Sequence, residues 1–298
     1  MGNLAQELSE TLAGVVESNG NGIVRVEARH GPPASGVVYA ADGVIVTSSH
    51  AVEREDGIEI GLPDGGTAQA TLTGRDQATD LAVLKVNATG LAPLKWSDGA
   101  GLKVGHLVLA LARPGRTARA TLGIVSALGP SWRAPTGGKL DRYLQADIQL
   151  FPGFSGGALV NLDGQALGLT TTGLLRRHPL AIPSTNLRKV VDAIVAHGTV
   201  KRGYLGVGIY PVRLAEPVAQ QVGQATGALL LSVQPGSAAE QAGLVQGDVL
   251  ISLDGTAVGH PGELSALLDE EKVGKEVTAK VARAGQIQEL KITVGARG

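Results

Sequence analysis

The chain has 298 residues, of which 43% are hydrophobic and 18% are charged, and its net charge is −1. This composition is typical of a soluble globular protein with two or three cores, and the balanced charge gives no reason to expect a nucleic acid or an acidic membrane surface as a partner. The absence of cysteine excludes disulfides, thiolate metal sites and cysteine nucleophiles. The 43 glycines and many short Val, Leu and Thr runs favour a turn-rich, mainly β protein.

The first predicted element is an amphipathic helix within residues 1–22. Asn3 is a plausible N-cap, and the Asn-Gly-Asn-Gly run at 19–22 predicts that the helix ends at Ser18. Its apolar positions recur at helical spacing: Leu4, Leu8, Leu12 and Val15 or Val16. We expect this helix to pack on the domain that follows, with a contact between subunits as the alternative.

The N-terminus has neither a basic region nor a continuous apolar region of the kind found in secretory signals. No apolar run approaches the length of a membrane span, so no span is expected. The protein is therefore expected in the cytoplasm, or in the periplasm or cell envelope if a leader has been removed.

From Gly22 to about Gly173, short β-prone runs alternate with Gly, Pro and Asp turns. His50 comes just past one predicted strand, in the run Asp-Gly-Val-Ile-Val-Thr-Ser-Ser-His-Ala-Val. Asp80 stands at the start of another, in Thr-Asp-Leu-Ala-Val-Leu-Lys-Val, and Asp76 is close enough to compete for its role. A histidine and a carboxylate at strand ends are candidates for a general base and the group that orients it.

A serine between glycines follows further along, in Gly153-Phe154-Ser155-Gly156-Gly157. Glycines allow the backbone to present both the hydroxyl and neighbouring N–H groups, which is the setting of a nucleophile. The run also fits the G-x-S-x-G elbow of α/β-hydrolases, but that elbow precedes a helix, whereas residues 158–169 are predicted to form two strands around an Asp163-Gly164 turn. The order His, Asp, Ser is instead that of chymotrypsin-like β-barrel proteases.

A helix is predicted to begin at 183–186 and to end before Gly198, and Lys201-Arg202-Gly203 is the predicted hinge. The remaining residues predict a small α+β domain. Its expected elements are a strand at 227–233, a short helix ending at Gly243, a strand at 248–253, a helix at about 262–271 and a hairpin at Ala284-Gly285.

These motifs together resemble the HtrA/DegP group of trypsin-like serine proteases, over nearly the whole chain. The matching runs are Asp42-Gly43 to Thr47 before the histidine, Thr79 to Leu84, Pro152 to Val160, Leu180 to Pro183 and Arg202 to Val207. The resemblance implies an N-terminal helix (1–22), a chymotrypsin-like double β-barrel protease domain (23–200) and one PDZ domain (201–298). Within the PDZ domain, Pro235 to Ala239, Ala242 to Leu244 and Gly247 to Leu250 carry the likeness.

By this resemblance the chain is an ATP-independent serine endopeptidase that acts on unfolded or damaged proteins in quality control and the stress response. No cofactor or metal is implied. The catalytic triad is His50, Asp80 and Ser155, and the backbone N–H groups of Gly153 and Ser155 form the oxyanion hole. The alternative is a catalytically silent scaffold whose PDZ domain recruits partner proteins.

Substrate recognition is expected at two places. An uncharged S1 pocket that favours small or medium aliphatic P1 residues is assigned to five residues: Gln149, Leu150, Thr170, Thr171 and Thr172. A loop that captures peptide C-termini in the PDZ domain is assigned to four: Tyr204, Leu205, Gly206 and Val207. Beside this loop Leu264, Leu267 and Leu268 would wall the groove, although at least one of them must belong to the core.

Two features depart from the family pattern. Relatives commonly have asparagine where this chain has Phe154, and Phe151 also replaces a usual polar residue, so the loop is either apolar at the S1 entrance or inactive at rest. With no charge at Phe154, activation by insertion of an N-terminal ammonium group is not expected. A homotrimer is typical of the family, but the aromatic residues that usually build it are missing before Tyr39.

Overall fold

The computed structural model describes residues 3–175 and 178–297, and the chain divides into two compact units, residues 1–199 and 200–298. In the first unit two closed β-barrels follow one another, as the sequence predicted. Each barrel has six strands among the described residues, joined by antiparallel pairs. Barrel interiors of this size are filled by side chains, here mainly aliphatic ones. The functional groups are therefore expected on loops at strand ends.

The first barrel has the strand order β1-β2-β3-β6-β5-β4 and closes through β1 and β4. Its strands are β1 (Ile23–Glu27), β2 (Ala34–Ala40), β3 (Val44–Ser48), β4 (Ile58–Gly61), β5 (Thr67–Asp76) and β6 (Leu81–Val86). One 3₁₀ turn, Ser49–Ala51, follows β3. The β3–β6 pairing places the ends of these two strands side by side, with Ser48 opposite Leu81.

The second barrel has the order β11-β14-β13-β12-β7-β8 and closes through β11 and β8. Its strands are β7 (Leu107–Ala112), β8 (Arg119–Gly129), β11 (Tyr143–Asp147), β12 (Ala158–Val160), β13 (Ala166–Thr171) and β14 (Leu180–Pro183). The short pair β9 (Trp132–Arg133) and β10 (Lys139–Leu140) lies in the loop before β11. Because a strand and not a helix follows Ser155, the α/β-hydrolase elbow is excluded.

Two helices complete this unit. The helix α2 (Ser184–His197) ends as predicted at Gly198, whose φ of 75° is the left-handed conformation of a C-cap glycine. The helix α1 (Leu4–Gly20) starts at the predicted N-cap but continues two residues past the predicted end. Asn19 stays helical because its side-chain amide bonds Val15 O at 2.9 Å instead of starting a turn.

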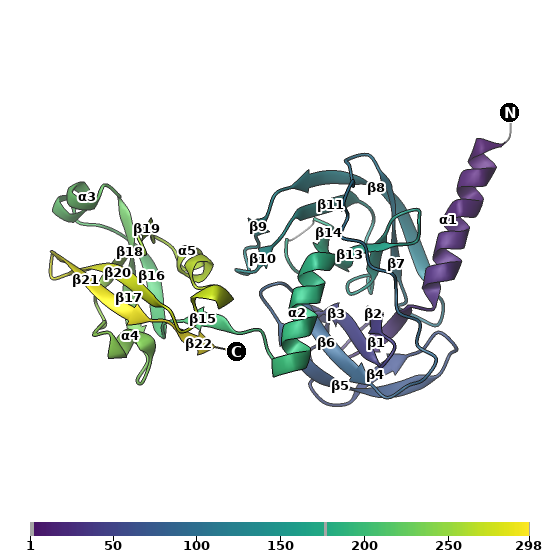
Figure 1. Ribbon diagram of the computed structural model, residues 1–298, viewed down its shortest axis with the longest axis horizontal. Coiled ribbons are helices and arrows are strands. Elements are labelled where there is room, and N and C mark those ends of the chain that lie inside the picture. The colour runs from purple at the N-terminus through teal and green to yellow at the C-terminus, as the bar shows by residue number, and fades with distance from the viewer. Residues whose placement is uncertain (1–2, 176–177, 298) are drawn as a thin grey trace. The chain divides into compact units, whose positions relative to one another are not determined.

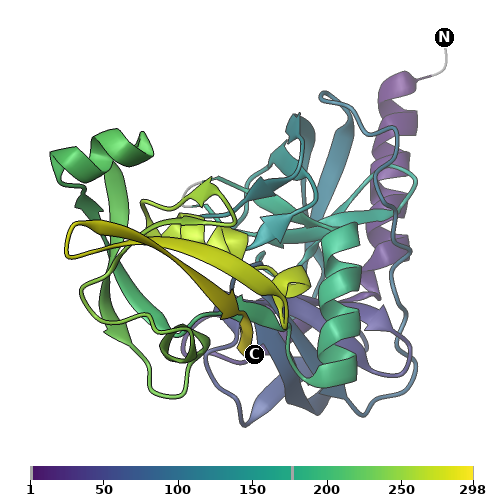
Figure 2. The same cartoon turned by 60° about the vertical axis from the view of Figure 1, so that its left-hand side comes forward.

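Only the last turns of α1 are buried against the barrels. Leu4 is 77% exposed and Leu8 37% exposed, and in both views the first half of the helix (purple) projects away from the barrels (Figures 1 and 2). The C-terminal end is held by Arg113, a buried residue whose guanidinium donates to Gly20 O at 2.8 Å and to Ile23 O at 2.7 Å. Burial lowers the pKa of this guanidinium.

The second unit is an α+β domain built on the strand order β16-β17-β18-β20-β21, with β19 on β18 and a separate β15–β22 pair. Its strands are β15 (Arg202–Tyr204), β16 (Val207–Arg213), β17 (Thr226–Val233), β18 (Val249–Leu253), β19 (Thr256–Ala257), β20 (Glu276–Arg283), β21 (Gln286–Thr293) and β22 (Gly295–Arg297). Its helices are α3 (Glu216–Val222), α4 (Ala238–Gln241), α5 (Pro261–Leu267) and the 3₁₀ turn Glu270–Lys272. Figure 2 shows the long β20–β21 hairpin in yellow.

The predicted hairpin turn is confirmed, since Ala284 and Gly285 both have positive φ, 50° and 81°. The helix predicted to reach residue 271 was too long. The chain leaves helical geometry at Leu268 (φ −106°, ψ 58°), which lets that side chain pack into the core. Among the described residues no helix is long and apolar enough to cross a membrane.

Candidate active site

His50 and Asp80 form the best-defined polar pair of the first barrel. His50 lies in the 3₁₀ turn after β3, and Asp80 precedes β6, so the pairing of these two strands brings the side chains together. His50 Nδ1 lies 2.8 Å from Asp80 Oδ2 and 3.0 Å from Oδ1, and the His50 backbone N–H donates to Oδ1 at 2.9 Å. The carboxylate is thus positioned to fix both the ring orientation and the tautomer of the histidine.

Asp80 is held in an unusual backbone conformation, with φ of 59°. Aspartate is one of the few residues with a side chain that tolerate this left-handed region. Asp76 does not compete for His50, because its carboxylate accepts from the Thr79 hydroxyl at 2.6 Å and from Ala78 N at 3.2 Å. The side chain of Asp80 is 6% exposed and that of His50 34%, so the ring's other nitrogen can face a substrate.

Two further residues complete the surroundings of this pair, and the sequence interpretation assigned neither role. Thr171, at the end of β13, donates its hydroxyl to Asp80 Oδ2. Gly173 lies so close that a Cβ there would be 2.7 Å from both Asp80 Oδ2 and His50 Nδ1. All six residues of β13 are buried, so the strand has no alternating pattern that singles out Thr171. A contact with a residue 91 positions away in the sequence also leaves no local signal.

Ser155 lies in the turn between β11 and β12 on the second barrel, and only 8% of the residue is exposed. Its Oγ is 3.2 Å from Thr172 Oγ1. No hydrogen bond joins Ser155 Oγ to His50 within the described residues. In this structure the His50–Asp80 hydrogen bond of the predicted triad is therefore formed, whereas the Ser155 hydroxyl points to Thr172.

The backbone around Ser155 leaves two N–H groups unused. Among the described residues, the N–H groups of Gly153 and Ser155 make no hydrogen bond, whereas that of Phe154 donates to Phe151 O at 3.0 Å. The Phe154 carbonyl accepts from the Thr170 hydroxyl at 2.7 Å and from Gly157 N at 3.0 Å. Because a trans peptide directs its C=O and N–H to opposite sides, this anchoring turns the Ser155 N–H outward.

The residues predicted to form an S1 pocket do not share one environment. Gln149 and Thr172 are exposed, and Leu150 is half-buried against the core of the second barrel. Thr170 and Thr171 are buried, and their hydroxyls serve the Phe154 carbonyl and Asp80. Phe154 is 1% exposed in the same core, while Phe151 is 45% exposed and its ring centroid lies 5.9 Å from that of Phe154.

The second unit also has a loop with free backbone donors. Gly206 has φ of 84°, and the N–H groups of Leu205 and Gly206 make no hydrogen bond in the part of the chain that is described. The carbonyls of these two residues accept from Ala239 N and Gln234 N, both at 2.8 Å. Tyr204 Oη donates to Gln234 Oε1 at 2.6 Å, and the side chain of Leu205 is buried.

Beyond this loop Val207 begins β16, which is an edge strand of the sheet and lies next to α5. An edge strand has unpaired N–H and C=O groups that an extended peptide can use. Of the three leucines predicted to wall a groove, Leu264 and Leu268 are buried in the core, and Leu267 is only partly buried. Leu267 is therefore the one that can face a bound chain.

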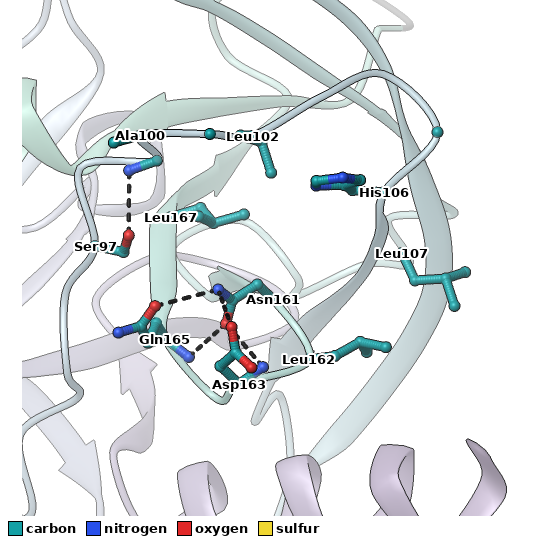
Figure 3. A pocket seen from close by; sticks show the side chains of 13 residues that line it. Ser97, Ala100, Leu102, His106, Leu107, Asn161, Leu162, Asp163, Gln165 and Leu167 are labelled. Carbon is teal, nitrogen blue, oxygen red and sulfur yellow. Dashed lines mark hydrogen bonds between the residues drawn. The ribbon is translucent and has the colours of Figure 1, made fainter. Parts of the chain in front are cut away.

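One cavity, of about 530 Å³, lies away from all these residues, between the 97–107 loop and the 161–165 turn of the second barrel (Figure 3). Asn161 bonds Asp163 and Gln165 on one side, and His106 stands apart from them (Figure 3). No residue predicted for catalysis lines it. No cluster of three or more potential metal ligands occurs among the described residues.

Known families match both units of the chain. The profile of the trypsin-like peptidase domain matches residues 34–169, and that of the PDZ domain matches residues 203–294. Curated relatives named "Probable periplasmic serine endoprotease DegP-like" are 37% identical over 269 residues in Marinomonas sp. (strain MWYL1) and in Halomonas elongata. These alignments cover 88% of this chain but 57% and 56% of the relatives, so the chain spans about half the length of the curated relatives it matches.

Solved structures resemble the chain over nearly its full length. "HtrA-type protease AlgW with decapeptide" and "Crystal structure of the serine endoprotease from Yersinia pestis" each superpose with a TM-score of 0.72 at 27% identity. Each similarity covers 96% of this chain and 98% of the other. The fold around His50, Asp80 and Ser155 is thus shared with proteins named as serine proteases.

Proposed function

Because the chain belongs to the trypsin-like serine proteases that carry a PDZ domain, the HtrA and DegP-like group, we propose that it is an active serine endopeptidase. The observation that carries the proposal is the hydrogen-bonded His50–Asp80 pair together with Ser155 and two backbone N–H groups that make no hydrogen bond among the described residues. A base with its orienting carboxylate, a nucleophile and an oxyanion site are the parts that acyl transfer needs.

In the proposed mechanism Asp80 accepts a hydrogen bond from Nδ1–H of His50, which leaves the unprotonated Nε2 as the base. The Ser155 hydroxyl rotates from Thr172 toward His50, gives up its proton and attacks the peptide carbonyl. The developing oxyanion is bound by the N–H groups of Gly153 and Ser155. His50 then protonates the leaving amine, and a water molecule activated by the same histidine hydrolyses the acyl-enzyme.

We further propose where this enzyme recognises its substrates. Gln149, Leu150 and Thr172 are the residues of the predicted S1 region left at least partly exposed, and none is charged, which supports small or medium aliphatic P1 residues. Capture of peptide C-termini by the second unit is supported by the edge strand β16 and by the N–H groups of Leu205 and Gly206, which have no partner in the described part of the chain. Structures of the relative AlgW are named for its complexes with a decapeptide and a tripeptide.

For the whole protein we propose degradation of unfolded or damaged proteins, without ATP and in the stress response, as the resemblance to the HtrA/DegP group implies. Those relatives are named periplasmic, which supports the periplasm or cell envelope and gives no support to the cytoplasm. The exposed Leu4 and Leu8 of α1 support a contact between subunits, in a homotrimer or another assembly.

The test compares cleavage of unfolded casein by the purified protein and by its Ser155→Ala variant, with and without a peptide that ends in an apolar residue. We expect cleavage by the wild-type protein alone, and stimulation by the peptide. The resting contact of Ser155 with Thr172 is the one observation that favours the scaffold alternative. Absence of both cleavage and labelling by a serine-reactive phosphonate in the wild-type protein would refute the protease and favour that alternative.

A further inference from the structure

Ser35 of the first barrel holds the nucleophile loop of the second. It lies in β2 and is completely buried. Its Oγ donates to Gly153 O at 2.7 Å, and its backbone N–H donates to Ser155 O at 3.2 Å. Ser35 therefore binds the carbonyls of Gly153 and Ser155, the two residues whose N–H groups make no hydrogen bond among the described residues. In sequence, Ser35 and Gly153 are 118 positions apart.

The direction of the Ser35 hydroxyl proton follows from its other partner. Arg113 N–H donates to Ser35 Oγ at 2.8 Å. A hydroxyl has one proton, so an oxygen that accepts from Arg113 directs that proton to the remaining neighbour, the Gly153 carbonyl. Arg113 is itself fixed, because its guanidinium is bonded to Gly20 O and Ile23 O.

This contact sets the orientation of the peptide between Gly153 and Phe154. Its carbonyl end is bound by Ser35 and its N–H end donates to Phe151 O, so the peptide plane is held at both ends. In contrast, the Pro152 carbonyl has no hydrogen bond among the described residues. The Gly153 N–H belongs to the same peptide as the Pro152 carbonyl. Its direction is therefore set mainly by the adjoining Gly153–Phe154 peptide plane and by the φ of 88° at Gly153.

The packing around the turn leaves little room for another arrangement. A Cβ on Gly156 would lie 2.4 Å from Thr47 Oγ1, which itself donates to Ser35 O at 2.7 Å. A Cβ on Gly153 would lie 2.7 Å from Pro33 O. The first barrel thus contacts the turn through the segment around Ser35, and that segment is itself hydrogen-bonded to β3.

We propose that Ser35 is a positioning residue for catalysis: through the Gly153 carbonyl, its hydroxyl orients the Gly153 N–H as an oxyanion donor. The inference rests on the proposed protease function and goes beyond it, since it assigns a role in transition-state binding to a residue of the other barrel. It does not assign Ser35 any contact with the substrate. Loss of the hydroxyl should therefore weaken binding of the tetrahedral species and leave ground-state binding unchanged.

The test is Ser35→Ala beside the matched control Ser184→Ala. Ser184 is also buried, and its hydroxyl also donates to a backbone carbonyl, Ser97 O at 2.5 Å, but it does not contact the turn. With a peptide amide substrate, we expect Ser35→Ala to lower kcat about 10- to 100-fold at unchanged KM. This is less than the about 100- to 1,000-fold cost of removing an oxyanion donor outright.

A peptide boronic acid, which forms a tetrahedral adduct with a serine, supplies a second readout. Its affinity should fall by the same factor as kcat, whereas the Kd of the substrate peptide, measured in the Ser155→Ala background, should not change. Ser35→Cys keeps the side-chain shape with a weaker S–H donor, so its kcat should lie between those of the wild type and Ser35→Ala. If Ser35→Ala does not fold, Ser35→Cys serves as the test variant in its place.

Two results separate this inference from the function on which it rests. A wild-type protein without turnover would refute the protease itself, and the inference with it. A wild-type enzyme with turnover, but with the Ser35 variants losing no more kcat per folded molecule than Ser184→Ala, would refute the role of Ser35 alone. A change confined to KM would do the same.

Discussion

Each unit of the chain has a loop centred on a glycine with positive φ that leaves two backbone N–H groups unused in the described structure. In the first unit these are the N–H groups of Gly153 and Ser155, and in the second those of Leu205 and Gly206. The same main-chain device suits an oxyanion and a carboxylate, because both are oxygen anions. What differs is the neighbourhood: a hydroxyl and a His–Asp pair beside one loop, an edge strand and a helix beside the other.

The two loops also differ in what supports them. Neutral hydroxyls, those of Ser35 and Thr170, bind the carbonyls of the first loop. The second loop is bonded to α4 through Ala239 N. In the turn that follows α4, Gly243 O accepts from Arg283 Nη2 at 2.7 Å, and Arg283 also forms an ion pair with Asp248. The supports of the second loop should therefore respond to pH, and those of the first should not.

The largest expected effect is that of His50→Ala, which tests whether the groups beside the two loops give the loops separate roles. It removes the base beside the first loop and leaves both loops intact. We expect kcat to fall by about 10⁶-fold, the order found when a member of a serine triad is removed, and the affinity of the second unit for a C-terminal peptide to stay the same. Single-turnover kinetics and calorimetry of peptide binding measure the two quantities. Loss of peptide affinity together with turnover would mean that the loops do not act separately.

The second prediction concerns the ion pair of the second unit. Burial raises the pKa of Asp248, but the hydrogen bonds from Arg283 and Val245 N–H outweigh burial and hold the pKa below its ordinary value of 3.8. A lowered pKa in the folded state stabilises the fold above about pH 4, and this contribution is lost as the pH falls through the lower folded-state value.

Arg283→Met leaves the buried Asp248 carboxylate without its partner and should cost about 3 kcal/mol at pH 7. Hydrogen exchange of peptides from residues 200–298, measured in the full chain, reports the stability of this unit. Without Arg283, burial should raise the pKa of Asp248 in the variant, so the gap should begin to shrink above pH 4 and shrink further as the wild-type carboxylate is protonated. A gap that is constant down to pH 2 would show that the pair stabilises by packing rather than by charge.

A third prediction tests whether the second loop depends on its glycine. In Gly206→Ala the new Cβ would meet Ser237 Cβ at 2.2 Å, at a backbone angle that alanine rarely adopts. We expect the affinity for a peptide C-terminus to fall about 10- to 100-fold, an estimate based on the cost of left-handed geometry plus the clash. Cleavage of a short substrate that does not need this unit should be unaffected. Gly223→Ala, also at positive φ but with open space around it, is the matched control.

The smallest expected effect is that of Thr172→Ala, which frees the Ser155 hydroxyl from its resting partner. A neutral hydrogen bond contributes about 1 kcal/mol, so kcat should rise by no more than about fivefold. Burst kinetics with an ester substrate would show it as a faster acylation phase. A large decrease would instead mean that the proposed place of Thr172 in the S1 region outweighs its contact with Ser155.

Much of this arrangement could be predicted from sequence, because the motifs that carry it are local. The glycines around Ser155 and the strand ends at His50 and Asp80 identify the candidate residues, and the double barrel and the second α+β unit followed from the same patterns and the resemblance they support. The ends of helices were less well predicted. Asn19 was taken as a stop signal but stays in α1, and α5 ends at Leu267 because Leu268 packs into the core.

The supports of the site could not be predicted, since they join residues that are far apart in the chain. Ser35 to Gly153 and Thr171 to Asp80 are separated by 118 and 91 residues. Thr171 was assigned from the sequence to the S1 pocket, and nothing in the sequence indicated that its hydroxyl donates to Asp80. Gly173 gave no signal at all, since only the folded structure shows that its missing side chain makes room for the His50–Asp80 pair.

The buried ring of Phe154 has a practical consequence for anyone who produces this protein. Phe154 precedes the nucleophile in the sequence and is apolar, so no carboxylate at this position can pair with a newly formed N-terminal ammonium group. A purification tag or a fluorescent reporter joined ahead of Asn3 should therefore leave peptidase assays unchanged.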